Sequence, residues 1–190
     1  MADSNITKQA LAVSLRELMT ETSFDKINVA QICERCGMNR KSFYYHFKDK
    51  YDLVNWIFDT DFISLTSAAA SPDSLRGRWD FIETVSDYFY QNRDFYRKTL
   101  QIKGQNSFSD HFTEYIHPIL KSRLADLIGN EQVDEFAIDF FTDAVLSAMK
   151  RWLLAKKCMP PEEFVSRIER LVRSGAIAIY QEIEQRAEGT

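Results

Sequence analysis

Positively charged side chains concentrate in a short stretch of the sequence. Between residues 35 and 50, a single acidic residue, Asp49, stands among five basic ones: Arg35, Arg40, Lys41, Lys48 and Lys50. Clustered Lys and Arg side chains neutralise phosphate groups, so this stretch predicts contact with a nucleic acid. The net charge of −4 for the whole chain hides this asymmetry. Residues 1–50 carry eight Lys and Arg against six Asp and Glu, or +2, and the remaining residues carry 16 against 22, or −6.

A second group that could do chemistry is the C-x-x-C pair of Cys33 and Cys36. This spacing is typical of zinc sites and of redox-active thiols. No second pair of cysteines or histidines completes four zinc ligands, and no strand precedes the pair, as a thioredoxin-like site would require. The three cysteines, with Cys158, cannot all pair, which suits a reducing compartment. We therefore expect Cys33 and Cys36 to pack as small apolar side chains.

His111, Glu114 and His117 follow one another at intervals of three, which could place metal ligands along one edge of a helix. Zinc motifs on helices normally use positions i and i+4, and Pro118 biases His117 away from helical geometry. We expect a polar rim or a pocket contact here rather than a metal site. The sequence also lacks a Ser-His-Asp set and a glycine-rich phosphate loop, so it predicts neither catalytic residues nor a cofactor.

Helices must position the basic stretch. The chain is 45% hydrophobic and 13% aromatic with only six Gly and four Pro, which favours an all-α fold with a packed core. Residues 5–21 predict an amphipathic helix, because apolar residues recur at spacings of three and four. These residues are Ile6, Ala10, Leu11, Val13, Leu15 and Leu18.

A second and a third helix are expected to form a helix-turn-helix around Gly37. Asn28 lies three residues before Gln31, a variant of the capping box that starts the second helix. Gly37 can take the left-handed conformation that ends this helix. Asn39 then caps a short third helix, on which two phenylalanines four residues apart face inward together. Such a helix can enter the major groove of DNA.

The segment from Phe24 to Leu53, with NVAQICERCGMNRKSFYYHFKDKYDL at its centre, resembles the DNA-binding domain of TetR-family transcriptional regulators. The shared features are the helix cap, the turn glycine, the Tyr-x-His-Phe stretch and a Lys beyond it. The resemblance implies that Tyr44 and Lys50 contact DNA phosphates, and that Asn28 does so at a helix start. Along the third helix it implies base contacts by Arg40, Lys41, Ser42 and Tyr45, flanked by Asn39 and His46.

Two positions depart from the family pattern. Asn28 stands where Thr or Ser is common, and Ser23 stands where Gly often precedes the Phe. The plain alternative for Tyr44 and Tyr45 is a surface aromatic pair that packs on the first helix. For Lys41, Lys48 and Lys50 the plain alternative is an ordinary solvent-exposed face. A helix-turn-helix that contacts protein instead of DNA is a further alternative.

Six further helices are predicted after the helix-turn-helix. Asp49 caps the fourth helix, which is predicted to end near residues 67–71, with Pro72 opening the next one. We expect this fourth helix to link two domains. The first is a three-helix DNA-binding domain at residues 1–50, and the second is a helical effector-binding and dimerisation domain at residues 51–190.

Aromatic residues are concentrated in the middle of the chain, where 37 residues hold ten of the 25 aromatics. Aromatics at helical spacing fit a generous helical core, and they equally fit a ligand pocket. TetR-like proteins bind effectors among the helices of this region. The resemblance therefore implies an unknown small-molecule effector near Trp79, Tyr88, Phe89, Phe112 and Tyr115.

Long apolar stripes mark the last two helices, which are predicted over about residues 131–157 and 161–184. The first stripe runs from Val133 to Trp152 and the second from Phe164 to Ile183. Gly175 inside the second helix costs about 1 kcal/mol relative to Ala, which indicates a close approach of helices. In the family, the equivalent helices build a four-helix dimer interface, so the resemblance implies a homodimer on a near-palindromic operator.

The segments NWIFDTDF and MPPEEFV resemble TetR-like regulators of the dihydroxyacetone-kinase regulator type. Members of that subgroup can act with a partner protein as activators, so repression and activation both stay open. The N-terminus lacks a basic region followed by an apolar run, and no apolar stretch approaches the roughly 18 residues of a membrane span. We expect a soluble cytoplasmic protein that binds double-stranded DNA and no membrane.

Overall fold

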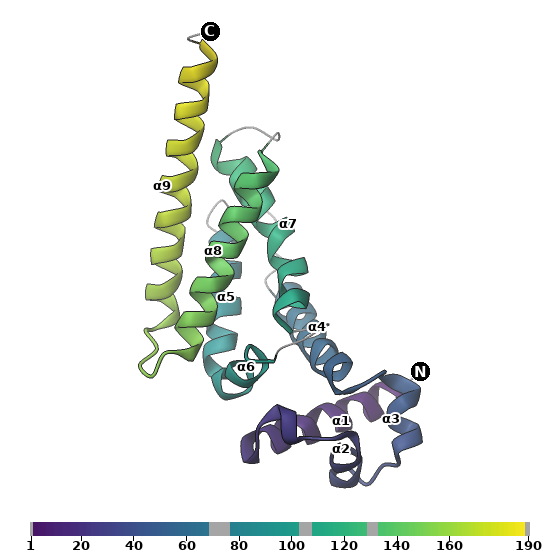
Figure 1. Ribbon diagram of the computed structural model, residues 1–190. Coiled ribbons are helices and arrows are strands. Elements are labelled where there is room, and N and C mark those ends of the chain that lie inside the picture. Colours follow the sequence, from purple (N-terminus) through teal and green to yellow (C-terminus); the bar gives the residue numbers. More distant parts are fainter. Residues whose placement is uncertain (1, 69–76, 103–107, 129–132, 189–190) are drawn as a thin grey trace. The chain divides into compact units, whose positions relative to one another are not determined.

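The computed structural model describes residues 2–68, 77–102, 108–128 and 133–188, and within them every regular element is a helix. The predicted all-α fold is confirmed, and so are the six helices that follow the helix-turn-helix. The helices labelled in Figure 1 are α1 (Ala2–Glu21), α2 (Val29–Arg35), α3 (Arg40–His46), α4 (Lys50–Ala68), α5 (Gly77–Gln91), α6 (Arg93–Thr99), α7 (Phe108–Ile128), α8 (Glu135–Leu154) and α9 (Pro161–Glu188). A short 3-10 turn, η1 (Phe24–Lys26), lies between α1 and α2.

The chain divides into two compact units. The N-terminal unit consists of Met1–Pro72 and Gln91–His111, and it holds α1 to α4, α6 and the first turn of α7. The C-terminal unit consists of Asp73–Tyr90 and Phe112–Thr190, and it holds α5, the rest of α7, α8 and α9. A domain boundary at residue 50 stays a prediction. The predicted helix start at Pro72 lies outside the described residues.

The buried face of α1 differs in part from the predicted one. Leu11, Leu15 and Leu18 are buried as expected, whereas Ile6 and Val13 are exposed. Each residue rotates a helix by about 100°, so Val13 points about 200° away from Leu11. Two apolar stripes overlap in this sequence, and only the leucine stripe is buried in the unit, where α1 meets α2, α3, α4 and α6. The prediction was therefore wrong for Ile6 and Val13.

Side-chain caps fix the starts of three helices in the N-terminal unit. The Asn28 carboxamide oxygen accepts from the Gln31 backbone N–H (3.0 Å), and the Gln31 side chain accepts from the Asn28 backbone N–H (2.9 Å). The Asn39 oxygen accepts from the Ser42 N–H at 2.8 Å. Asp49 accepts from two N–H groups of the first turn of α4, each at 2.9 Å. All three predicted caps are confirmed.

Gly37 forms the turn between α2 and α3. Its φ of 68° lies in the left-handed region that side chains with a Cβ rarely adopt. The N–H of the following Met38 donates to the Cys33 carbonyl at 2.8 Å, which closes the end of α2. The prediction that this glycine ends the second helix is confirmed.

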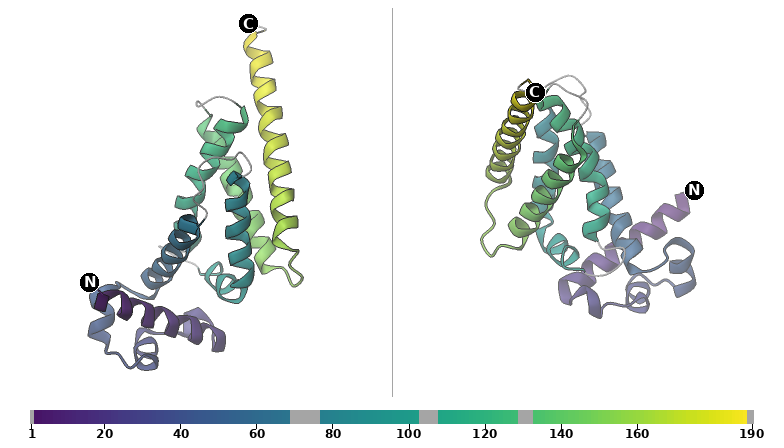
Figure 2. Two further views of the ribbon diagram at one scale, coloured as in Figure 1. Left: turned by 180° about the vertical axis from the view of Figure 1, so that it is seen from behind. Right: turned by 45° about the horizontal axis from the view of Figure 1, so that its top comes forward.

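The C-terminal unit is held together by apolar packing of α7, α8 and α9. In both views of Figure 2, α8 and α9 run side by side. Trp152 of α8 stacks on Phe164 of α9 with ring centroids 4.3 Å apart, and its indole N–H donates to the Met159 carbonyl at 2.9 Å. A cluster of buried side chains forms part of the core: Leu124, Val133, Ile138, Phe141, Val172 and Ala176.

Gly175 allows α9 to approach α8 of the same chain. A Cβ at this position would lie 3.2 Å from Cζ of Phe141. The predicted close approach is confirmed, but the neighbour is a ring within the chain. A larger side chain at Gly175 therefore disturbs this internal packing first.

Pro118 lies inside α7 and does not end it. The expectation that this proline moves His117 out of helical geometry was wrong. Proline in a helix interior costs about 3 kcal/mol or more, because it removes one backbone hydrogen bond and crowds the preceding turn. Phe112 and Leu120 are buried on either side of it, and Pro118 itself is exposed. Burial on both sides keeps the helix continuous.

Candidate nucleic-acid interface

Aromatic packing fixes α3 within the N-terminal unit. Phe43 is fully buried, and its ring centroid lies 5.8 Å from that of Phe47. The Phe47 ring in turn meets Trp56 of α4 at 5.7 Å. These contacts hold one face of α3 against the unit and turn the opposite face outward.

Two tyrosines lie on the outward side of α3. Tyr45 is 83% exposed and Tyr44 is 53% exposed. The Tyr45 ring meets the edge of His46 at 4.9 Å, and the Tyr44 ring meets Phe43 at 5.5 Å. Each ring thus contacts a neighbour on α3 and leaves much of its surface accessible to a ligand.

Arg40, Lys41 and Lys48 form the accessible part of the basic stretch. All three are exposed, and within the described residues their side chains make no hydrogen bond or ion pair. Arg40 and Lys41 belong to the first turn of α3, and Lys48 follows its end. Three cations without local partners raise the potential on this side of α3, which attracts a polyanion.

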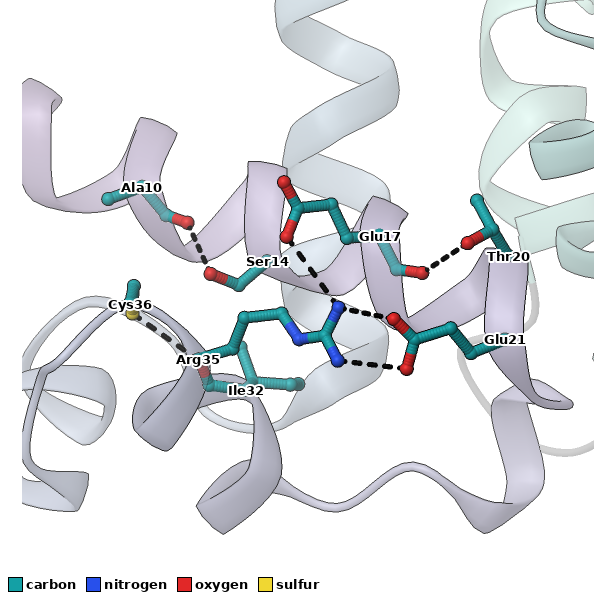
Figure 3. A network of polar contacts seen from close by, with 8 residues as sticks. All are labelled: Ala10, Ser14, Glu17, Thr20, Glu21, Ile32, Arg35 and Cys36. Atoms are coloured by element: carbon teal, nitrogen blue, oxygen red, sulfur yellow. Dashed lines mark hydrogen bonds and ion pairs between the residues drawn. The ribbon is translucent and has the colours of Figure 1, made fainter.

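Arg35 is basic in sequence but is neutralised in the structure. Its guanidinium donates to both carboxylate oxygens of Glu21, at 2.6 and 2.8 Å, and lies 3.7 Å from Glu17. Figure 3 shows Arg35 of α2 between these two residues of α1. The hydrogen bond from Arg35 lowers the pKa of Glu21. Arg35 thus ties α2 to α1 and leaves the free positive charge to the residues around α3.

Lys50 is engaged in a different way. Its ammonium donates to the carbonyls of Phe24 (2.8 Å), Ile27 (2.7 Å) and Asp25 (3.4 Å), and it lies 4.4 Å from the Phe24 ring centroid. An ammonium has three N–H donors, and each has an acceptor here. Burial lowers the pKa of Lys50. A phosphate contact by Lys50 stays a prediction, and it would have to replace part of this set.

The other predicted DNA-binding side chains lie close to α3 or at the start of α2. The carboxamide oxygens of Asn28 and Asn39 are used as helix caps, so only their NH₂ groups remain as donors. The Ser42 hydroxyl donates to the Asn39 oxygen at 3.2 Å. His46 is half-buried between the rings of Tyr45 and Phe47.

A clamp from α6 supports the helix-turn-helix, and sequence reasoning missed it. Asp61 of α4 accepts from Arg16 of α1 at 2.5 Å and from the Tyr96 hydroxyl of α6 at 2.7 Å. The Arg16 guanidinium also lies 4.4 Å from the Phe95 ring centroid. Lys98 donates to two carbonyls at the end of α1. The partners are 35 to 79 residues apart in sequence, so no local spacing reveals them.

The C-terminal unit contains an apolar cavity with about 420 Å³ of empty space, part of it open to solvent. Its wall comes from α5, α7 and α8. Phe112 belongs to this wall, and Phe89 packs edge-on against Phe112 at 5.3 Å. Tyr88 and Tyr115 are half-buried and do not line it, and the Trp79 side chain lies outside the described residues. The wall residues are Ile82, Val85, Phe112, Ile116, Ile119, Leu120, Val145, Leu146 and Met149.

The histidines of α7 have separate partners. His111 lies 2.6 Å from Asp59 of α4, and His117 lies 3.2 Å from Asp139 of α8. Among the described residues, no three His, Cys, Asp or Glu side chains are grouped as metal ligands. Within the same ranges, no helix is long and apolar enough to cross a membrane.

The C-x-x-C cysteines differ in burial. Cys33 is buried, and burial raises the pKa of its thiol. Cys36 is half-buried, and its thiol lies 3.4 Å from the Ile32 carbonyl within α2. A buried thiol with a raised pKa is a poor nucleophile and packs as a small apolar group.

Two family models match this chain. Residues 13–57 match bacterial regulatory proteins of the tetR family, and residues 78–174, just over half of the chain, match the transcriptional regulator C-terminal region. The chain belongs to the TetR family of transcriptional regulators. It is therefore a DNA-binding regulator whose helix-turn-helix is formed by α2 and α3.

Several relatives show how far this TetR-family protein resembles others. It is 28% identical over 102 residues to the dhaKLM operon transcriptional activator DhaS of Lactococcus lactis. The matched segment covers 54% of this chain and only 53% of DhaS. It is 21% identical over 140 residues to the transposon Tn10 TetC protein of Escherichia coli, covering 70% and 71% of the two chains. The structure of a TetR regulator from Streptococcus agalactiae shares the fold, with a TM-score of 0.70 and 20% identity over 90% of this chain and 96% of that one.

Proposed function

We propose that this TetR-family regulator acts as a homodimer on a near-palindromic operator, and that a small molecule in the C-terminal cavity changes its affinity for DNA. The observation that carries the proposal is the presence of two separate exposed surfaces. One is the cationic and aromatic side of α3. The other is an apolar stripe on α8 and α9.

The apolar stripe supports the homodimer. Phe136 and Phe140 lie one turn apart on α8 and are 76% and 56% exposed, and Leu171 of α9 is 69% exposed. Phe136 and Phe140 are neighbours on one face of α8, and such an exposed apolar patch is typical of protein interfaces. A two-fold dimer would bury the same patch from both subunits. Two copies of α3 held about 34 Å apart can enter successive major grooves.

Specific roles on DNA follow from exposure and charge. Arg40 and Lys41, in the first turn of α3, are placed to reach base edges, where Arg is the commonest reader of guanine. Tyr44 of α3 and Lys48, just after the end of α3, suit phosphate contacts, which position a protein without reading sequence. The proposal assigns Lys50 to holding α4 against the η1 segment.

The cavity supports the effector part of the proposal, and α7 supplies a route for coupling. Phe108 and His111 in its first turn contact Phe58 of α4, with ring centroids 5.3 and 5.9 Å apart. The next residue, Phe112, belongs to the cavity wall. A ligand that shifts α7 would thereby act on α4, by no more than its difference in affinity between the two states.

Selection of bound sequences from a random DNA pool tests the DNA-binding part. We expect an enriched near-palindrome, two chains per site in sedimentation, and an affinity that falls steeply with salt, because bound phosphates release counterions. A contact made with protein instead would enrich no sequence. One chain per site at saturation would contradict the dimer.

A second candidate is an activator that works with a partner protein and binds no small molecule itself. The match to DhaS, which is named a transcriptional activator, favours it. Transcription from a promoter that carries the selected site separates the two. A repressor lowers the yield of transcript by itself, whereas this activator leaves the yield unchanged until the partner is added.

A further inference from the structure

We infer that the cavity of the C-terminal unit takes an uncharged, largely apolar molecule with one hydrogen-bonding group, and that the hydroxyl of Ser86 pairs with that group. The inference rests on the proposed function, because it names the chemical class of the effector. Three observations carry it: the chemistry of the wall, the adaptable side chains around the cavity, and the state of Ser86.

The wall excludes charge. All of its described side chains are hydrocarbon or thioether groups, and among them no charged or polar side chain lines the cavity. An ion that enters such a site loses its hydration and gains no counter-charge, so a charged ligand is strongly disfavoured. A small polyol is disfavoured as well, because most of its hydroxyls would have no partner.

The cavity is small in this structure, because the space that water-sized molecules can reach is only about 30 Å³. A compact organic molecule therefore enters by moving side chains of the wall. Among these side chains, Val85, Phe112 and Met149 are buried, while Ile116 and Ile119 are half-buried. Met149 has a flexible side chain that can adjust to the shape of a ligand.

Ser86 supplies a polar group on the side of α5 that faces the cavity wall. It follows Val85 and lies one turn after Ile82, so it shares a side of α5 with two wall residues. Ser86 has no exposed surface, and its hydroxyl has no hydrogen-bond partner. An unpaired buried hydroxyl is costly and rare in folded proteins.

Other hydroxyls on helices of this protein do not share that state. The side chains of Ser14, Thr60 and Thr142 each donate to the carbonyl four residues earlier, at 2.9, 2.9 and 2.7 Å. Ser86 does not use this common solution, so its hydroxyl remains available to a ligand. Because Ser86 is fully buried, the ligand reaches it by moving side chains of the wall.

Three probes with the same ring system test the inference: naphthalene, 1-naphthol and 1-naphthoate, titrated into the full-length protein by calorimetry. We expect 1-naphthol to bind about 2- to 12-fold more tightly than naphthalene, which is the usual range for one net hydrogen bond. We expect 1-naphthoate to bind at least about 100-fold more weakly than 1-naphthol. Equal affinities for naphthoate and naphthol would overturn the inference.

The Ser86→Ala variant gives a double readout. It should remove the preference for 1-naphthol over naphthalene, and it should raise the melting temperature of the empty protein because an unpaired hydroxyl is lost. A preference for naphthol that survives in Ser86→Ala overturns the role of Ser86. Filling the cavity with Ile116→Trp should abolish binding of all three probes, whereas Ile6→Trp, at an exposed site on α1, should not.

The same samples separate this inference from the proposed function. If no probe binds while the protein still binds its selected DNA site, the ligand class is wrong and DNA recognition stands. If the probes bind in the expected order without changing DNA affinity, the ligand class stands and control of DNA binding by the cavity fails.

Discussion

The two units of this protein differ in which side chains find partners within the chain. In the N-terminal unit, Lys50 has three carbonyl acceptors and Arg35 has a bidentate partner in Glu21. In the C-terminal unit, large apolar side chains are exposed on α8 and α9, and a buried hydroxyl is left unpaired. Lys50 and Arg35 are thus satisfied within their own unit, which leaves Arg40, Lys41 and Lys48 for a ligand. The C-terminal unit, by contrast, has apolar groups and a hydroxyl that a partner or a ligand would satisfy.

The largest expected effect is a loss of stability when the core of the N-terminal unit is truncated. Phe43→Ala should lower the free energy of unfolding by about 3–5 kcal/mol, because it removes a fully buried ring. Denaturant unfolding checks this. Tyr45→Ala, two residues away and exposed, is the control: it should leave stability within about 0.5 kcal/mol and weaken DNA binding. Equal losses of stability would show that α3 is not anchored by one face.

The next effect concerns the incomplete surface of the C-terminal unit. Phe140→Asp places a carboxylate in the proposed dimer interface and should raise the dissociation constant of the dimer at least about 100-fold, since a charge would be buried without a partner. Analytical ultracentrifugation measures it. Lys156→Asp adds the same carboxylate at an exposed position beyond α8 and should leave the dimer intact. A dimer unchanged by Phe140→Asp would place the interface elsewhere.

Lys50 allows a finer test, because a phosphate contact and a structural role predict different changes in the salt dependence of DNA affinity. Lys50→Met should lower the free energy of unfolding by about 1–3 kcal/mol, since hydrogen bonds from a charged group to carbonyls are lost. DNA affinity should fall as well, with an unchanged slope of affinity against salt. Lys48→Ala, at the exposed lysine proposed to contact phosphate, should leave stability unchanged and reduce the slope by about 1.

A reduced salt slope for Lys50→Met would instead support the family prediction that this lysine contacts DNA. That outcome would mean that the carbonyl contacts are exchanged for a phosphate when DNA binds.

The smallest effect is the pH dependence of the ion pair between Glu21 and Arg35. The folded-state pKa of Glu21 is lowered from 4.5, so the pair adds stability above that value and loses it as the pH falls through the lowered pKa. Arg35→Gln should therefore destabilise the protein at neutral pH and converge with the wild type in acid. The difference should be small because the pair is exposed. Urea unfolding at several pH values measures it, with Arg40→Gln as the unpaired control.

The sequence predicted the N-terminal unit well where short-range chemistry decides the structure. Asn28, Gly37, Asn39 and Asp49 each act through partners within a few residues, so their roles follow from spacing alone. Ile6 and Val13 were misplaced for the opposite reason. Which of two overlapping apolar stripes is buried depends on the other helices that pack against α1.

The site of the C-terminal unit was harder to predict because it depends on three helices that are distant in sequence. Aromatic enrichment pointed to Phe112, which does line the cavity, but most of the wall is aliphatic. Aliphatic residues are the normal filling of any helical core, so nothing in their spacing distinguishes a cavity from packing. Gly175 shows the same limit: its presence indicated a close contact without indicating which ring it meets.

The clamp formed by α6 has a consequence for how the N-terminal unit is made. Residues 1–68 are synthesised before Phe95, Tyr96 and Lys98, so the end of α1 and the carboxylate of Asp61 are made before their later partners. The unit is complete only once residue 111 has been synthesised. A chimera joined after residue 50 would lose these contacts, whereas exchanging the chain after His111 would keep them.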